Sequence, residues 1–156
     1  MLDLYTWNTP NGRKLSIALE EMELDYQCIA IDITKDDQFA PDFLEFNPNN
    51  KIPAIRDGDQ SIFESGAILI YLARKSGKFL AEEGNAQYWK TLEWLMWQMG
   101  GYGPMLGQAH HFVHYNPDKS AYAAERYAAE AQRLSGVLDR HLEKSESLTD
   151  TLSRAC

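Results

Sequence analysis

The sequence predicts an α/β domain followed by an all-helical domain. In the first half, short strand patterns alternate with helix patterns in the order βαβαββα, which is typical of a mixed four-stranded sheet with helices on its faces. In the second half, long amphipathic helix patterns occur without strands. We therefore expect two domains, at residues 1–77 and 85–156.

The first domain begins with a crossover unit. Residues 2–7 alternate as a strand does, and a Thr-Pro-Asn-Gly turn at 9–12 separates them from a helical pattern at 14–21. A second strand is expected over 26–33. It is followed by a short helix that starts with Pro41, because proline suits the first turn of a helix.

A hairpin and a further helix complete this domain. Residues 53–63 contain two strand patterns around a turn at 57–60. The next helix is expected from Ser65 to Ser76. Gly77 closes it, because glycine readily adopts the left-handed conformation that ends helices.

Two long helix patterns, at 86–99 and 120–142, define the second domain. Gly100–Gly101 and Pro104 interrupt the first pattern, since glycine weakens a helix and proline removes one of its hydrogen bonds. We expect a bend there, with the helix resuming through His114.

Composition and charge argue against several classes of function. The 156 residues carry a net charge of −8 and their basic residues are scattered, which opposes nucleic-acid binding. No apolar run approaches the roughly 20 residues that cross a bilayer, and the N-terminus lacks the charged start of a signal peptide. We expect a soluble, cytoplasmic protein without membrane or nucleic-acid partners. Cys28 and Cys156 lie far apart, and Cys28 is interpreted as a buried small hydrophobe.

Two short stretches of the first domain predict a pocket for a small anionic peptide. Pro53 holds the preceding residue extended, so the N–H and C=O there can pair with a ligand's backbone. Glu64 and Ser65 stand just before an apolar helix, whose unpaired first N–H groups and dipole favour an anion. One stretch would hold the middle of the peptide and the other its carboxylate end.

Four motifs, in order along the chain, resemble those of the cytosolic glutathione transferases, and more narrowly the bacterial nu class, which is related to the yeast prion-forming nitrogen regulator. They are Thr9-Pro10-Asn11-Gly12, Asn49-Asn50-Lys51-Ile52-Pro53, Phe63-Glu64-Ser65-Gly66 and Gly103-Pro104-Met105-Leu106-Gly107-Gln108. The resemblance runs from residue 1 to about residue 144. It implies a thioredoxin-like first domain, an all-helical second domain, glutathione as co-substrate and a homodimer.

The resemblance places Thr9 and Asn11 nearest the glutathione sulfur. Free thiols titrate near pKa ~8.5, so hydrogen-bond donors are needed to stabilise the reactive thiolate. Asn11, the N–H groups that open the first helix and the Thr9 hydroxyl offer such donors. Tyr5 lies within a strand, where we expect it to pack rather than to activate the thiol. No cysteine occupies this turn, so bound glutathione itself would perform any disulfide chemistry.

The remaining implied contacts surround the peptide. Ile52, joined to Pro53 by a cis bond, would pair through its backbone with the cysteinyl unit. The other roles also come from the resemblance: the γ-glutamyl end would be held by Glu64 and Ser65, the glycyl side would be contacted by Gln38 and Lys51, and a partner subunit would supply Arg126.

Some positions in the helical domain have ordinary alternatives. By default Arg126 is a solvated helix residue, with Glu130 four positions on as its partner. His110 and His114 have a spacing that can bind zinc, but no Glu-x-x-His context accompanies them and we expect no metal. Neighbouring polar and aromatic residues suggest instead the wall of a second-substrate pocket.

Two functions follow from the resemblance. The first is a glutathione-dependent transferase or disulfide-bond oxidoreductase, in which the enzyme-bound glutathione thiolate reduces small disulfides or attacks an electrophile. The alternative is a noncatalytic glutathione-binding or protein-interaction module. Proteins of this family usually continue with further helices beyond the position at which this chain stops, Cys156, so we expect an incomplete helical domain.

Overall fold

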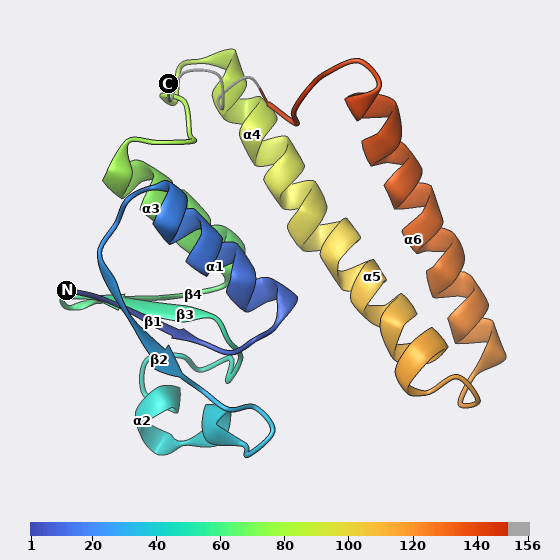
Figure 1. Ribbon diagram of the computed structural model, residues 1–156, viewed down its shortest axis with the longest axis horizontal. Helices are drawn as coiled ribbons and strands as arrows, with labels where there is room; N and C mark the ends of the chain where they lie inside the picture. The colour runs from blue at the N-terminus through green and yellow to red at the C-terminus, as the bar shows by residue number, and fades with distance from the viewer. Residues whose placement is uncertain (150–156) are drawn as a thin grey trace. The chain divides into compact units, whose positions relative to one another are not determined.

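The computed structural model describes residues 1–149, so the end of the predicted helical domain, with Cys156, lies outside the described residues. The chain divides into two compact units, Met1–Leu80 and Ala81–Cys156 (Figure 1). Within the described part of the chain, no helix has the length and apolar character needed to cross a membrane.

The first unit is built on a four-stranded mixed sheet of order β2-β1-β3-β4. In this sheet β1 (Leu2–Thr6) pairs in parallel with β2 (Tyr26–Ala30) and antiparallel with β3 (Ala54–Asp57). The hairpin partner of β3 is β4 (Gln60–Phe63). The predicted element order and the mixed sheet are both confirmed.

Helices cover both faces of this sheet (Figure 1). On one face lie α1 (Pro10–Glu21) and α3 (Ser65–Ser76), and α2 (Pro41–Leu44) lies on the other. Apolar side chains fill the space beneath α1 and α3: Leu2, Leu4, Leu15, Leu19, Met22, Ile55, Ile68, Leu72 and Ala73. Burial of such a cluster supplies the main driving force for folding this unit.

A smaller cluster lies on the α2 side of the sheet. Ile31, Phe43 and Ala54 are buried in it, and Tyr5 and Phe46 pack against them. The Tyr5 and Phe46 ring centroids lie 4.8 Å apart. Tyr5 therefore packs in the core as predicted.

Two predictions about local detail have different outcomes. Gly77 ends α3 with φ of 70°, the left-handed value expected for a glycine cap. Cys28 was predicted to be buried, and this is wrong because its side chain is exposed. The reason is strand order: β2 is an outer strand of the sheet, and among the strands of residues 1–149 it pairs with β1 alone.

The second unit contains a long helical run followed by a separate helix. The run comprises α4 (Ala86–Trp97), η2 (Gln98–Tyr102), α5 (Gly103–His110) and η3 (His111–Tyr115), in which η2 and η3 are π-helical turns. The separate helix, α6 (Ala121–Leu142), lies alongside α5 (Figure 1).

The predicted interruption near Pro104 is one of these π-helical turns. The Gly103 N–H donates to the Gln98 carbonyl, five positions earlier, and the helix continues beyond Pro104. A Cβ on Gly103 would lie 2.6 Å from Gln98 Nε2 and 3.1 Å from the Gln98 carbonyl oxygen. A side chain at this position would therefore require the Gln98 side chain to move and the widened turn to shift slightly.

Candidate functional site

The first turn of α1 is closed by Thr9. Its Oγ1 accepts a hydrogen bond from the Gly12 N–H at 3.1 Å, and its carbonyl accepts one from the Arg13 backbone N–H at 3.0 Å. Pro10 has no N–H, and the Gly12 and Arg13 N–H groups bond Thr9. The Asn11 N–H is therefore the first-turn donor that these bonds do not use. The Asn11 side chain is exposed. Because Thr9 Oγ1 accepts in the cap, its hydroxyl proton can still be donated to another group.

Gly12 sets how closely this turn approaches the end of β1. A Cβ at Gly12 would lie 2.4 Å from both Thr6 Oγ1 and the Trp7 carbonyl oxygen. Any side chain there would push α1 away from the strand. The position of Thr9 and Asn11 therefore depends on glycine at residue 12.

A buried asparagine shapes the loop before β3. Asn47 is fully buried, and its Nδ2 donates to the Lys51 carbonyl oxygen at 2.6 Å. The bond between Ile52 and Pro53 is cis, as the resemblance implied. Strand pairing of β3 with β1 begins at Ala54, so the backbone of Ile52 lies outside that ladder. The Lys51 side chain is exposed.

Glu64 connects this loop to the start of α3. Its backbone has φ of 71° and ψ of 114°, a region that non-glycine residues rarely adopt and that is found at ligand-binding sites. Asn49 Nδ2 donates to Glu64 Oε1 at 3.1 Å. Ser65, the first residue of α3, is buried with 4% of its surface exposed. The two predicted ligand-binding stretches therefore meet in the structure.

The Glu64 charge also acts on α1. Burial lowers the pKa of Lys14, and the Glu64 carboxylate opposes this shift. A negative group that bound beside Glu64 would therefore lie in the field of a half-buried lysine. The start of α1, the loop before β3 and the start of α3 thus contribute to one region.

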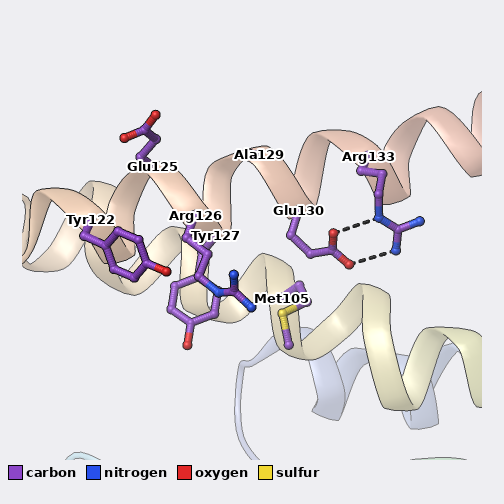
Figure 2. A pocket seen from close by; sticks show the side chains of 8 residues that line it. All are labelled: Met105, Tyr122, Glu125, Arg126, Tyr127, Ala129, Glu130 and Arg133. Carbon is purple, nitrogen blue, oxygen red and sulfur yellow. Dashed lines mark hydrogen bonds and ion pairs between the residues drawn. The ribbon is translucent and has the colours of Figure 1, made fainter.

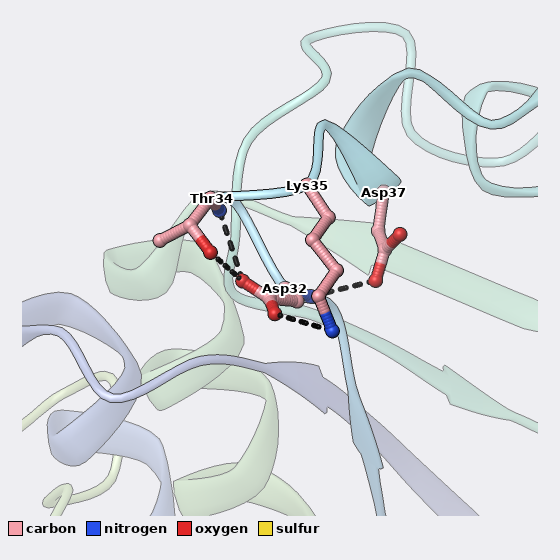
Figure 3. Close-up of polar contacts among 4 residues, drawn as sticks. All are labelled: Asp32, Thr34, Lys35 and Asp37. Carbon is pink, nitrogen blue, oxygen red and sulfur yellow. Dashed lines mark hydrogen bonds and ion pairs between the residues drawn. The ribbon is translucent and has the colours of Figure 1, made fainter.

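The loop that precedes Gln38 is organised by two carboxylates, those of Asp32 and Asp37 (Figure 3). Asp32 Oδ1 accepts hydrogen bonds from the Thr34 N–H at 3.0 Å and the Thr34 hydroxyl at 2.6 Å, and Lys35 lies 3.3 Å from Oδ2. Asp37 Oδ2 accepts from the Asp32 N–H at 3.0 Å. The Thr34 hydrogen bonds, with Lys35, lower the pKa of Asp32. This loop leads into η1 (Asp37–Phe39), which holds Gln38.

The Gln38 side chain has an unsatisfied acceptor. Its Oε1 is buried and accepts no hydrogen bond from any of residues 1–149. Its Nε2 lies 3.5 Å from Asp36 Oδ1. Buried acceptors are nearly always paired, so an unpaired one needs an explanation such as a ligand or a water molecule.

Arg126 lies in the second unit, on α6, where it lines a cavity of about 860 Å³ (Figure 2). Glu130 was predicted to be its partner, and this is wrong. Both Glu130 oxygens instead accept from Arg133, at 2.7 and 2.8 Å. Arg133 lies three positions after Glu130 on the same helix, which places their side chains on one face.

Several supporting residues were missed by sequence reasoning. Asn47 and Asn49 hold the loop before β3, and Asp32 and Asp37 hold the loop that carries Gln38. The Asn-rich stretch before Lys51 was the sequence signal for Asn47 and Asn49. Within residues 1–149, no group of three or more His, Cys, Asp or Glu residues could hold a metal ion.

Comparison with known proteins identifies relatives of both units. The family model described as "Glutathione S-transferase, N-terminal domain" matches residues 1–74. Disulfide-bond oxidoreductase YfcG of Escherichia coli K12 is 55% identical over 152 residues, which are 93% of this chain and 70% of YfcG. Disulfide-bond oxidoreductase YghU of the same organism is 45% identical over 90% of this chain, which spans 52% of its length.

A solved structure shows the same fold. Glutathione transferase from Pseudomonas putida, with one glutathione disulfide bound per subunit, superposes with a TM-score of 0.90 and is 45% identical. The match covers 96% of this chain and 68% of that one. The thioredoxin-like fold of the first unit and the helical character of the second are thereby confirmed.

Proposed function

Because this chain belongs to the glutathione transferase family, we propose that it binds glutathione in its first unit and uses the glutathione thiolate to reduce small disulfides. The observation that carries the proposal is the Asn49–Glu64 hydrogen bond of 3.1 Å, which joins the loop before β3 to the start of α3. It sets a carboxylate, in a backbone conformation rare for glutamate, beside the first N–H groups of a helix. Such a pair of opposite charges suits the amino and carboxylate groups of a γ-glutamyl end.

The proposed contacts of the γ-glutamyl end are complementary in charge. Glu64 accepts from its ammonium group, and Ser65, at the start of α3, donates to its carboxylate. The half-buried Lys14 adds positive charge to this region. Ile52 pairs through its backbone with the cysteinyl unit, and Pro53 ends that contact because it has no N–H.

On the other side of the ligand, Lys51 and Gln38 contact the glycyl residue. Lys51 supplies a positive charge for its carboxylate. The Gln38 side chain turns toward the ligand, so that its buried and unpaired Oε1 accepts from an amide N–H. The chain forms a homodimer in which Arg126 reaches the glutathione of the partner subunit. This role is supported by the cavity that Arg126 lines on α6.

In the proposed reaction, Thr9 and Asn11 donate hydrogen bonds to the glutathione sulfur and so favour its thiolate. The thiolate attacks one sulfur of a small disulfide, forms a mixed disulfide and releases the other sulfur as a thiol. A second glutathione then attacks the mixed disulfide. One disulfide is reduced to two thiols, and two glutathione molecules are oxidised to glutathione disulfide. Attack of the same thiolate on an electrophile is a secondary activity.

The direct test is turnover of 2-hydroxyethyl disulfide, followed as NADPH consumption coupled to glutathione reductase. We expect turnover by the wild-type chain and a large loss in Asn11→Ala, while the circular dichroism spectrum stays unchanged. Asn8→Ala is the matched control, because Asn8 directly precedes the same turn but its Oδ1 accepts hydrogen bonds from the Arg13 side chain. Equal activity of Asn11→Ala and wild type would contradict the role of Asn11.

Calorimetry with reduced and oxidised glutathione separates this function from the alternative. Binding without turnover would favour the noncatalytic glutathione-binding or protein-interaction module. If neither form of glutathione binds, the proposed pocket itself is wrong.

A further inference from the structure

The cavity on α6 is lined by two arginines and two glutamates, Glu125 and Glu130, of which only Glu130 lies between the arginines in sequence. Arg126 and Arg133 both line it, together with Glu130, and Met105 from α5 contributes to its wall (Figure 2). On a helix, Glu130 can reach either arginine, because residues three or four apart lie on one face. Which arginine it takes decides which guanidinium is left for a ligand.

Glu130 is fully engaged by Arg133. Arg133 Nε donates to Glu130 Oε2 at 2.7 Å, and Arg133 Nη2 donates to Oε1 at 2.8 Å. The hydrogen bonds from Arg133 lower the pKa of Glu130, and the charge of Arg126 lowers it further. Arg126 is therefore close enough to act on Glu130, although it makes no hydrogen bond or ion pair with another residue in the described part of the chain.

Helix geometry explains why Glu130 pairs with Arg133 and not with Arg126. An acidic residue that precedes its basic partner is favoured over the reverse order, and Glu130 precedes Arg133 but follows Arg126. The planar guanidinium also matches both oxygens of one carboxylate, which is the stronger arrangement. Without Arg133, the next available partner for Glu130 would be Arg126, although this pair has the less favourable order.

We propose that Arg133 is a positioning residue: by occupying both oxygens of Glu130, it keeps the Arg126 guanidinium available for the carboxylate of a bound ligand. The inference rests on the proposed contact between Arg126 and glutathione. It predicts that loss of Arg133 weakens ligand binding only while Glu130 is present to capture Arg126.

The test is the dissociation constant for reduced glutathione, measured by calorimetry on four variants of the full chain. Arg126→Gln should weaken binding about tenfold, since hydrogen bonds to charged groups are lost. Arg133→Gln should weaken it about two- to threefold, the scale of one new helical ion pair. The double variant Glu130→Gln/Arg133→Gln should bind like wild type, and Arg133→Lys, which can still pair with Glu130, should do so too.

Restored glutathione binding in the double variant distinguishes a positioning role of Arg133 from a merely structural one. Loss of helix stability alone would make the double variant at least as weak as Arg133→Gln. Circular dichroism checks that each variant is folded, and the Arg133 and Glu130 side chains are partly exposed, at 59% and 35%.

Each negative result identifies which of the two proposals is wrong. If Arg126→Gln binds as tightly as wild type, the proposed role of Arg126 is wrong, and the inference fails with it. If Arg126→Gln weakens binding but Arg133→Gln does not, or if the double variant is not restored, the role of Arg133 alone is wrong. Absence of binding by the wild-type chain would overturn both proposals.

Discussion

Asn49 Nδ2 donates to Glu64 Oε1 at 3.1 Å and thereby links two segments that lie fifteen positions apart in the sequence. Glu64 has φ of 71°, so its side chain starts from a backbone geometry that the surrounding structure must hold in place. The link fixes the direction of a carboxylate that we propose binds the ligand ammonium group.

Asn49→Ala should weaken glutathione binding several-fold, because the Glu64 carboxylate loses a donor that orients it. Calorimetry measures the change. A double-mutant cycle with Glu64→Gln supplies the control: once the carboxylate is gone, removal of the Asn49 amide should have little further effect. Additive losses in the cycle would mean that Asn49 acts independently of Glu64.

Gln38→Leu should separate stability from binding. The substitution removes a buried acceptor without a partner, so the melting temperature of the ligand-free protein should stay constant or rise. Glutathione affinity should fall, because the ligand N–H loses its acceptor. Thermal unfolding with and without glutathione measures both effects, and Gln132→Leu on the exposed part of α6 is the control. A lower melting temperature without ligand would show that Gln38 supports the fold instead.

Gly12→Ala should destabilise the first unit by about 1–3 kcal/mol, since a Cβ would clash with Thr6 and the Trp7 carbonyl. Urea unfolding measures the free energy. Gly107→Ala is the matched control, because a Cβ there meets nothing within 4 Å and alanine stabilises a helix relative to glycine by roughly 0.5–1 kcal/mol. Equal effects of the two substitutions would show that the turn can move away from β1.

Asp57 should make stability depend on pH. The Tyr71 hydroxyl donates to Asp57 Oδ2 at 2.7 Å, and Lys75 Nζ lies 2.6 Å from the same atom. The Lys75 and Tyr71 hydrogen bonds lower the pKa of Asp57 below its usual 3.8. Because the folded pKa is the lower one, this stabilisation is present above the unfolded pKa and is lost as pH falls through the folded pKa.

Asp57→Asn should therefore cost about 1–3 kcal/mol of unfolding free energy at pH 7. The difference from wild type should shrink as the pH falls below 3.8. Tyr71→Phe keeps the ring and removes one donor, so it should show a smaller change of the same sign. Denaturant unfolding between pH 7 and pH 2 provides the measurement, and a difference that stays constant over this range would exclude the ionised Asp57 as its source.

Local sequence signals were sufficient for much of the fold. Gly77 could be predicted as a helix end because left-handed geometry favours glycine, and Pro41 could be predicted at a helix start because its missing N–H is not needed there. The two stretches that we propose bind the ligand could be identified for the same reason, since proline and a helix N-terminus have fixed chemistry at short range.

Features that depend on tertiary arrangement could not be predicted in this way. Cys28 has the neighbours of a buried strand residue, and only the strand order makes β2 an outer strand. Glu130 has an arginine within helical reach on either side, and side-chain geometry selects Arg133. The pairing of Asn49 with Glu64 requires the hairpin between them to bring two loops together.

The π-helical turn at Gln98–Tyr102 sets the direction in which the side chains of α5 point. Each residue of an α-helix advances the helix by about 100° of rotation. The wide turn takes up one additional residue, so every later side chain lies about 100° from where an unbroken α-helix of the same residues would place it. Deletion of Gly100 would return the turn to α-helical spacing and remove that additional residue, so Met105 would still face the α6 cavity that it lines. The π-helical turn thus lets the long helical run hold one more residue without changing which of its surfaces faces its neighbour.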